Sequence, residues 1–124
     1  MTTLTDFTAH RIDGLIVAGG RVGYQSAYVL HKARDSFSAL DIPIACMPMT
    51  INNDVPATEL SIGSDTALNS IVADVDKIRQ SAVATRRVFV VEVMGRHAGW
   101  IALHSGMAGG AHAILIPEIP FDLD

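Results

Sequence analysis

Three short polar loops hold the residues of this sequence that could do chemistry. They are the glycine run Gly19 to Gly23, the polar cluster Met49 to Asp54, and the tetrapeptide Met94 to His97. Each loop follows an apolar run that reads as a buried strand. Because ligands collect at the carboxyl ends of the strands in an open parallel sheet, we expect the site among these loops.

The glycine run could bind a phosphate. Gly19, Gly20 and Gly23 would let the backbone approach the phosphate of a cofactor, and the N-terminus of a following helix favours an anion. The alternative is an ordinary turn between strand and helix, because glycine pairs end strands in many folds that bind nothing.

The second loop combines a hydroxyl, two amides and a carboxylate. Thr50 can donate to a phosphate oxygen, and Asp54 could act as a base or hold a metal ion. Asn52 and Asn53 can hydrogen-bond sugar hydroxyls. The alternative is a set of local turns, which Asn and Asp form readily.

The third loop offers a cation beside a glycine. Gly95 permits a close backbone approach, and Arg96 presents a planar fork to a phosphate or carboxylate. His97 could carry a proton, or it could be a polar surface residue at a helix start. His104 and His112 have no partner at metal-ligand spacing, so we predict no zinc site.

The elements that must position these loops alternate between strand and helix. Such alternation, with nearly continuous apolar strands, predicts the α/β class, with a mainly parallel sheet of about four strands in a partial three-layer domain. The expected strands are 15–18, 44–47, 88–93 and 113–116. The expected helices run from the glycine run to about Phe37, from Gly63 to about Ala84, and from Trp100 to near Gly109.

Composition narrows the class of partner. Nine Lys and Arg against 13 Asp and Glu give a net charge of −4, and the basic residues are scattered, which argues against nucleic acid. No apolar run approaches the roughly 20 residues that span a bilayer, so we expect no membrane segment and a cytoplasmic protein. The single Cys46 lies in an apolar run and is predicted to be a core residue.

One α/β domain is expected over residues 12–124, after a polar lead over residues 1–11. The residues after Pro120 belong to no expected element. Because the chain stops so soon after a strand, we expect it to come from a longer protein.

With these loops in view, the sequence resembles the phosphofructokinase family from about Ile12 to Phe121. The resemblance is carried by three motifs in the right order and separation: Thr50 to Asp54, Ser61 to Ala67, and Val90 to Arg96. It implies a Rossmann-like fold and phosphoryl transfer in glycolysis to the 1-hydroxyl of fructose 6-phosphate. Magnesium and ATP, or pyrophosphate in a sister group, are the implied cofactors.

Two positions depart from the pattern of active family members. Those enzymes have an aspartate that serves magnesium where this chain has Arg21, and an aspartate that acts as the base where it has Asn52. Met49 stands where ATP users usually have glycine and pyrophosphate users lysine. The resemblance therefore implies no metal ligand in this glycine run and a lost base at position 52.

The sugar-binding side of the family pattern is kept. Thr50, Asp54, Met94, Gly95 and Arg96 match positions around the sugar phosphate. A further match, Arg87, corresponds to an arginine that family members lend to a neighbouring subunit, which implies a homo-oligomer or contact with another phosphofructokinase subunit.

Two functional hypotheses follow from the resemblance. In the first, the chain contributes sugar-phosphate binding to a 6-phosphofructokinase and is inactive alone, because the first strand and nucleotide loop of the family and its 6-phosphate clamp have no counterpart here. In the second, it is a non-catalytic, allosteric domain that binds a fructose bisphosphate, as in the regulatory half of eukaryotic-type enzymes. The altered glycine run favours the second hypothesis, and Met94-Gly95-Arg96 favours the first. A third, more general alternative is a structural or interaction module.

Overall fold

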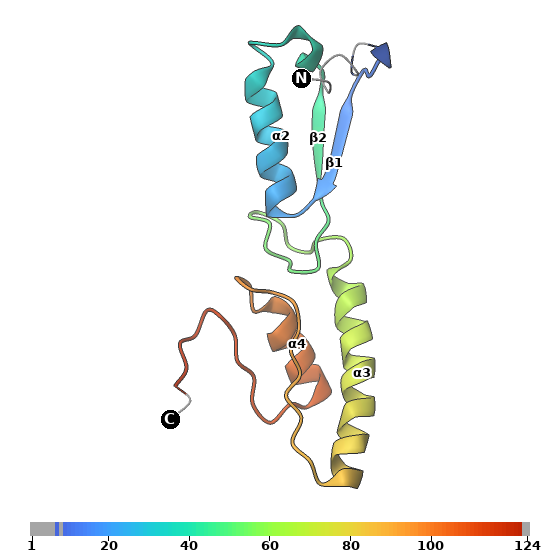
Figure 1. The fold of residues 1–124 in the computed structure, drawn as a ribbon, viewed down its shortest axis with the longest axis vertical. Coiled ribbons are helices and arrows are strands. Elements are labelled where there is room, and N and C mark those ends of the chain that lie inside the picture. Colours follow the sequence, from blue (N-terminus) through green and yellow to red (C-terminus); the bar gives the residue numbers. More distant parts are fainter. Residues whose placement is uncertain (1–6, 8, 123–124) are drawn as a thin grey trace. The chain divides into compact units, whose positions relative to one another are not determined.

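The computed structural model describes residue 7 and residues 9–122, and the chain divides between Met49 and Thr50 into two compact units. The first unit contains strand β1 (Leu15–Gly19), helix α2 (Arg21–Ala33), the 3₁₀ turn η1 (Ser38–Leu40) and strand β2 (Ile44–Pro48). The two strands are parallel, with Leu15 opposite Ile44 and Gly19 opposite Pro48. Helix α2 lies against both strands (Figure 1).

This first unit confirms the α/β class and both expected strands. Its helix ends at Ala33, and turns rather than a further helical stretch lead to Phe37. The prediction for Cys46 is wrong, because its side chain is exposed. Among the described elements β2 contacts only β1 and α2, so the side chains on the sheet face without a covering element stay accessible to solvent.

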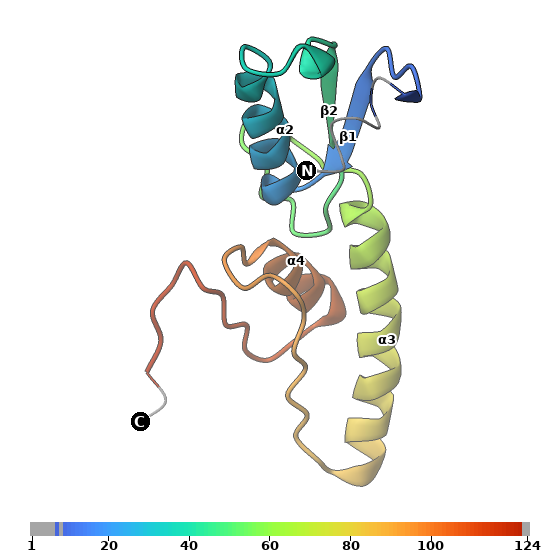
Figure 2. The same cartoon turned by 45° about the horizontal axis from the view of Figure 1, so that its top comes forward.

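The second unit is built on two helices, α3 (Ser64–Thr85) and α4 (Trp100–Gly109), which lie side by side (Figure 2). Both helices were expected from the sequence. Ile101, on α4, is fully buried and forms the centre of the small core. At the end of α4 the backbone approaches α3 so closely that a Cβ on Gly109 would lie 2.7 Å from a methyl group of Val75.

The prediction of about four strands is wrong for the described residues, whose sheet has two. Residues 88–93 are extended, and Val88 and Val90 are 95% exposed whereas Phe89 and Val91 are 46% and 45% exposed. This alternation is typical of a strand. Residues 88–94 make no backbone hydrogen bond to the described chain, and residues 113–116 join no ladder. Local preference makes these segments extended, but a strand also needs a partner.

The predicted lead over residues 1–11 lies largely outside the described residues, and its boundary with a domain from residue 12 stays a prediction. In the described part of the chain no helix is both long and apolar enough to cross a membrane.

Candidate functional site

The glycine run forms the tight connection between β1 and α2. Gly20 is the residue before the helix and has extended backbone angles. A Cβ on Gly19 would lie 3.4 Å from the Cα of Gly23, so the strand end and the first helical turn pack backbone to backbone. No side chain caps the N-terminus of α2, which leaves its first N–H groups directed at solvent or a ligand. The phosphate contact predicted for Gly19, Gly20 and Gly23 stays a prediction.

Magnesium does not fit this run of residues. Arg21 is exposed, and the first turn of α2 contains no acidic residue. Magnesium in proteins is held by oxygen ligands, chiefly carboxylates, and a guanidinium repels it. Nowhere in the described part of the chain do three or more His, Cys, Asp or Glu side chains gather to hold a metal ion.

The loop that begins at Thr50 is held in one conformation by its own side chains. The Asn52 N–H donates to Thr50 Oγ1 over 3.2 Å. Asn53 spans the loop, because its Oδ1 accepts the Ser61 N–H at 2.8 Å and its Nδ2 donates to the Glu59 carbonyl at 3.2 Å. Asn53 also has a φ of 50°, a left-handed conformation that Asn tolerates better than most residues.

The far end of this loop is tied to helix α3. Ser64, the first residue of α3, is fully buried, and its Oγ donates to the Ser61 carbonyl at 2.7 Å. Gly63 precedes the helix with a φ of 93°, which favours glycine. Gly63 is the N-cap residue of α3, and no side chain caps the helix. Asp65 lies in the first turn, where a carboxylate interacts favourably with the helix dipole.

Two polar atoms in this loop are buried without a hydrogen-bond partner among the described residues. They are Asn52 Oδ1 and Ser61 Oγ. A buried acceptor left unpaired costs about 1–3 kcal/mol, so such atoms call for a donor. Asn53, by contrast, is fully used in closing the loop. The two amides, which the sequence treated alike, thus differ: Asn52 has a free buried acceptor and Asn53 is structural.

The third loop is a tight turn in front of α4. Gly95 has a φ of 122°, and the Ala98 N–H donates to the Gly95 carbonyl at 3.3 Å. A Cβ on Gly95 would collide with the Ala98 carbonyl oxygen, so only glycine fits this position. The turn leaves Met94, Arg96 and His97 exposed. Arg96 is therefore presented to solvent by a turn whose shape depends on Gly95.

The structure joins some of the predicted site residues and not others. Thr50 and Asn52 are joined by a hydrogen bond. Within the described residues no hydrogen bond or ion pair involves the side chain of Asp54, Arg87 or Arg96. Arg87 is exposed beyond the end of α3, with its N–H donating to the Ala82 carbonyl at 3.1 Å. Its predicted role at a neighbouring subunit stays a prediction.

One residue of structural importance was missed. The Glu118 carboxylate accepts the Gly99 N–H at 2.7 Å, although 19 positions separate the two residues. The only signal in the sequence is an acidic residue directly after the Ile-Pro pair that ends an apolar run, which is too common a pattern to predict a contact.

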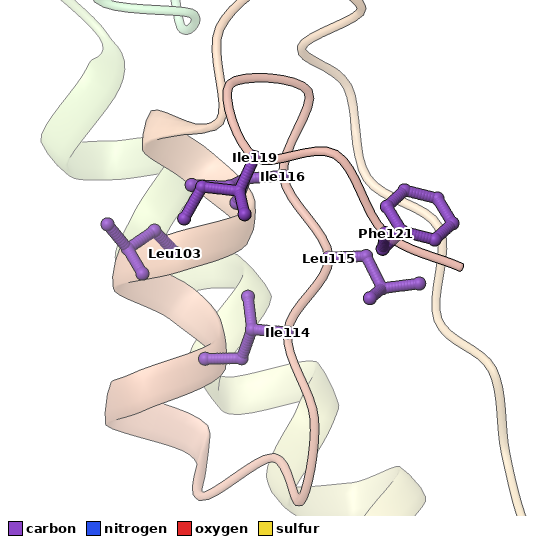
Figure 3. A pocket seen from close by; sticks show the side chains of 6 residues that line it. All are labelled: Leu103, Ile114, Leu115, Ile116, Ile119 and Phe121. Atoms are coloured by element: carbon purple, nitrogen blue, oxygen red, sulfur yellow. The ribbon is translucent and has the colours of Figure 1, made fainter. Parts of the chain in front are cut away.

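Two hollows of the second unit are lined mainly by apolar side chains. The smaller, of about 120 Å³, lies between α4 and the C-terminal segment (Figure 3). Its six lining side chains are all apolar: Leu103, Ile114, Leu115, Ile116, Ile119 and Phe121. The larger, of about 520 Å³, is bounded by the two helices and the two unpaired extended segments, and Val, Ile and Ala dominate its lining. Arg79, Arg87 and His112 also line this larger hollow.

Comparison with known proteins agrees with the motifs. The phosphofructokinase family model matches residues 1–124. An ATP-dependent 6-phosphofructokinase of Natranaerobius thermophilus is 47% identical over 113 residues, which are 91% of this chain and 33% of the relative. The chain thus spans about a third of the length of that enzyme.

Solved structures give the same result. A phosphofructokinase of Pichia pastoris in the T-state matches with a TM-score of 0.91 and 42% identity, over 98% of this chain and 13% of that one. A pyrophosphate-dependent phosphofructokinase of Marinobacter aquaeolei matches with a TM-score of 0.77 and 34% identity, over 96% and 32%. The chain belongs to the phosphofructokinase family.

Proposed function

We propose that this chain is the part of a 6-phosphofructokinase that recognises the sugar phosphate, and that it supplies neither the base nor a magnesium ligand for the transfer. The observation that carries the proposal is the buried, unpaired Oδ1 of Asn52, at the position where active family members have the catalytic aspartate. An amide oxygen accepts a hydrogen bond from a sugar hydroxyl as a carboxylate does.

The Asn52 amide can bind a sugar hydroxyl but cannot act as a general base. A neutral amide has no basicity at ordinary pH, so it cannot take the hydroxyl proton that a general base removes. The loss of a general base lowers a rate by about 10²–10⁴-fold. Recognition of fructose 6-phosphate without turnover at this site is the expected result.

The other residues that would contact the sugar phosphate stand at positions that match the family pattern. The Thr50 loop is already closed by Asn53 and Ser64, so little conformational entropy is lost when a sugar binds. Arg96 would pair with a phosphate from the exposed turn held by Gly95. In this proposal Asp54 accepts from a second sugar hydroxyl.

A fructose bisphosphate is the second candidate ligand. Arg21 favours it, because a cation where active members have a metal-binding aspartate attracts a phosphate. Within the first unit, the glycine run and the N-terminus of α2 would offer N–H donors to a phosphate beside Arg21.

Calorimetric titration of the intact protein tests the proposal. We expect heat of binding with fructose 6-phosphate or fructose 1,6-bisphosphate, and a loss of about 3- to 10-fold in affinity for Asn52→Ala, the value of one neutral hydrogen bond. Asn69→Ala is the matched control, because Asn69 is an exposed amide bonded only within α3. Absence of binding by both sugars, or equal effects of the two substitutions, would contradict the proposal.

A further inference from the structure

The N-terminus of α4 obtains its carboxylate from a distant part of the chain. Helix α4 has no acidic residue in its first turn, and no side chain of its own caps it. Glu118 fills this role, with its Oε1 2.7 Å from the Gly99 nitrogen. A charged acceptor at a helix N-terminus makes a stronger bond than a neutral one and also opposes the positive end of the helix dipole.

The bond is supported by the packing of the whole C-terminal segment. Ile114 and Ile116 are two positions apart in the segment before the turn, and the turn at Pro117 and Glu118 is closed by the Ile119 N–H, which donates to the Ile116 carbonyl at 3.3 Å. Ile114 lies against Gly106, where a Cβ would come within 2.8 Å of its side chain, and Ile116 lies against Gly99, where a Cβ would come within 2.5 Å. Figure 3 shows Ile114 and Ile116 directed towards α4. The segment therefore delivers Glu118 to Gly99 in a fixed register.

Gly99 is buried, and its contact with Glu118 leaves no room for a side chain. A Cβ at Gly99 would also lie 2.5 Å from Glu118 Oε2, so no larger residue fits beneath the carboxylate. Gly99 directly follows the turn in which the Ala98 N–H bonds the Gly95 carbonyl. One end of the Gly95 turn is thereby anchored to the Glu118 carboxylate, while Arg96 projects from its exposed side.

We propose that Glu118 is a positioning residue for the sugar-phosphate site, because it holds Gly99 and so fixes the turn that presents Arg96. The inference rests on the proposed function, since Glu118 would affect sugar-phosphate binding only through the position of Arg96. Glu118 does not touch the sugar phosphate in this proposal. Its effect is to keep Arg96 from sampling directions in which the guanidinium cannot reach a phosphate.

The test uses the intact protein with Glu118→Ala and the conservative Glu118→Gln, and with Asp74→Ala as a control. Asp74 is an exposed acid on α3 paired with Lys77, away from this contact. We expect Glu118→Ala to speed hydrogen exchange of the peptide that contains residues 95–99 and to weaken fructose 6-phosphate affinity by about tenfold. Glu118→Gln keeps an oxygen acceptor, so its exchange rate and its fructose 6-phosphate affinity should lie close to those of the unmodified protein. Asp74→Ala should change neither the exchange rate nor the affinity.

Unchanged exchange in Glu118→Ala would overturn the inference, because the bond would not be holding the turn. Faster exchange with unchanged sugar affinity would also overturn it and would leave Glu118 as a helix cap alone. If the unmodified protein binds no sugar phosphate, the proposed function fails and the positioning role fails with it, while the exchange experiment still reports whether the bond forms.

Discussion

At the scale of single residues, the two neighbouring asparagines of the Thr50 loop have opposite roles. Asn53 uses its acceptor and its amide hydrogens to bridge the loop, whereas the acceptor of Asn52 is buried and unpaired. The sequence alone could not separate them, because both side chains have the same donors and acceptors. Only the path of the backbone between Asn53 and Ser61 decides which amide is used within the loop.

This division of roles predicts that Asn53 contributes more to stability than to chemistry. Asn53→Ala removes two hydrogen bonds and leaves the N–H of the buried Ser61 without an acceptor, which should lower the free energy of unfolding by about 1–3 kcal/mol. Urea denaturation of the intact protein measures this change. Asn69→Ala, which removes bonds of an exposed amide on α3, should cost less, and equal losses for both variants would contradict the assigned role.

At the scale of elements, the sequence predicted the helices and the first two strands well. Apolar residues recur at helical spacing along residues 64–85, and the run before Gly19 is apolar and β-branched. Local sequence is therefore enough to predict these elements. The hydrogen bond from Gly99 to Glu118 could not be predicted in this way. It depends on a contact across 19 positions, which neither periodicity nor turn chemistry encodes.

Two glycine-to-alanine substitutions distinguish the effect of helix packing on stability from the effect of helix propensity. Gly109→Ala should lower the melting temperature of the intact protein, because its methyl group would lie 2.7 Å from a Val75 methyl and overpacking costs about 1–3 kcal/mol. Gly23→Ala is the matched control. Its Cβ would meet Val17 at an ordinary 3.6 Å, so the better helix propensity of Ala should leave stability unchanged or higher by up to about 1 kcal/mol.

Circular dichroism during thermal unfolding compares these two variants. A stabilising Gly109→Ala would show that the two helices are not packed as closely at that point as the structure indicates.

At the scale of the whole molecule, the expected sheet of about four strands is where the prediction failed. Residues 88–93 alternate in exposure as a strand does, yet their backbone has no partner among the described residues. A run of Val and Phe reports a preference for extended backbone but not the presence of a neighbour. The chain spans about a third of the length of its bacterial relative.

The proposed recognition requires a sugar hydroxyl to donate to Asn52 Oδ1, and a crystal structure of the intact protein with fructose 6-phosphate measures that contact directly. We predict a sugar hydroxyl oxygen within about 3.2 Å of Asn52 Oδ1, with the Asn53 bridge to Ser61 unchanged. A bound sugar that leaves Asn52 Oδ1 without a contact, or an Asn52 side chain turned to a donor of the protein itself, would contradict it.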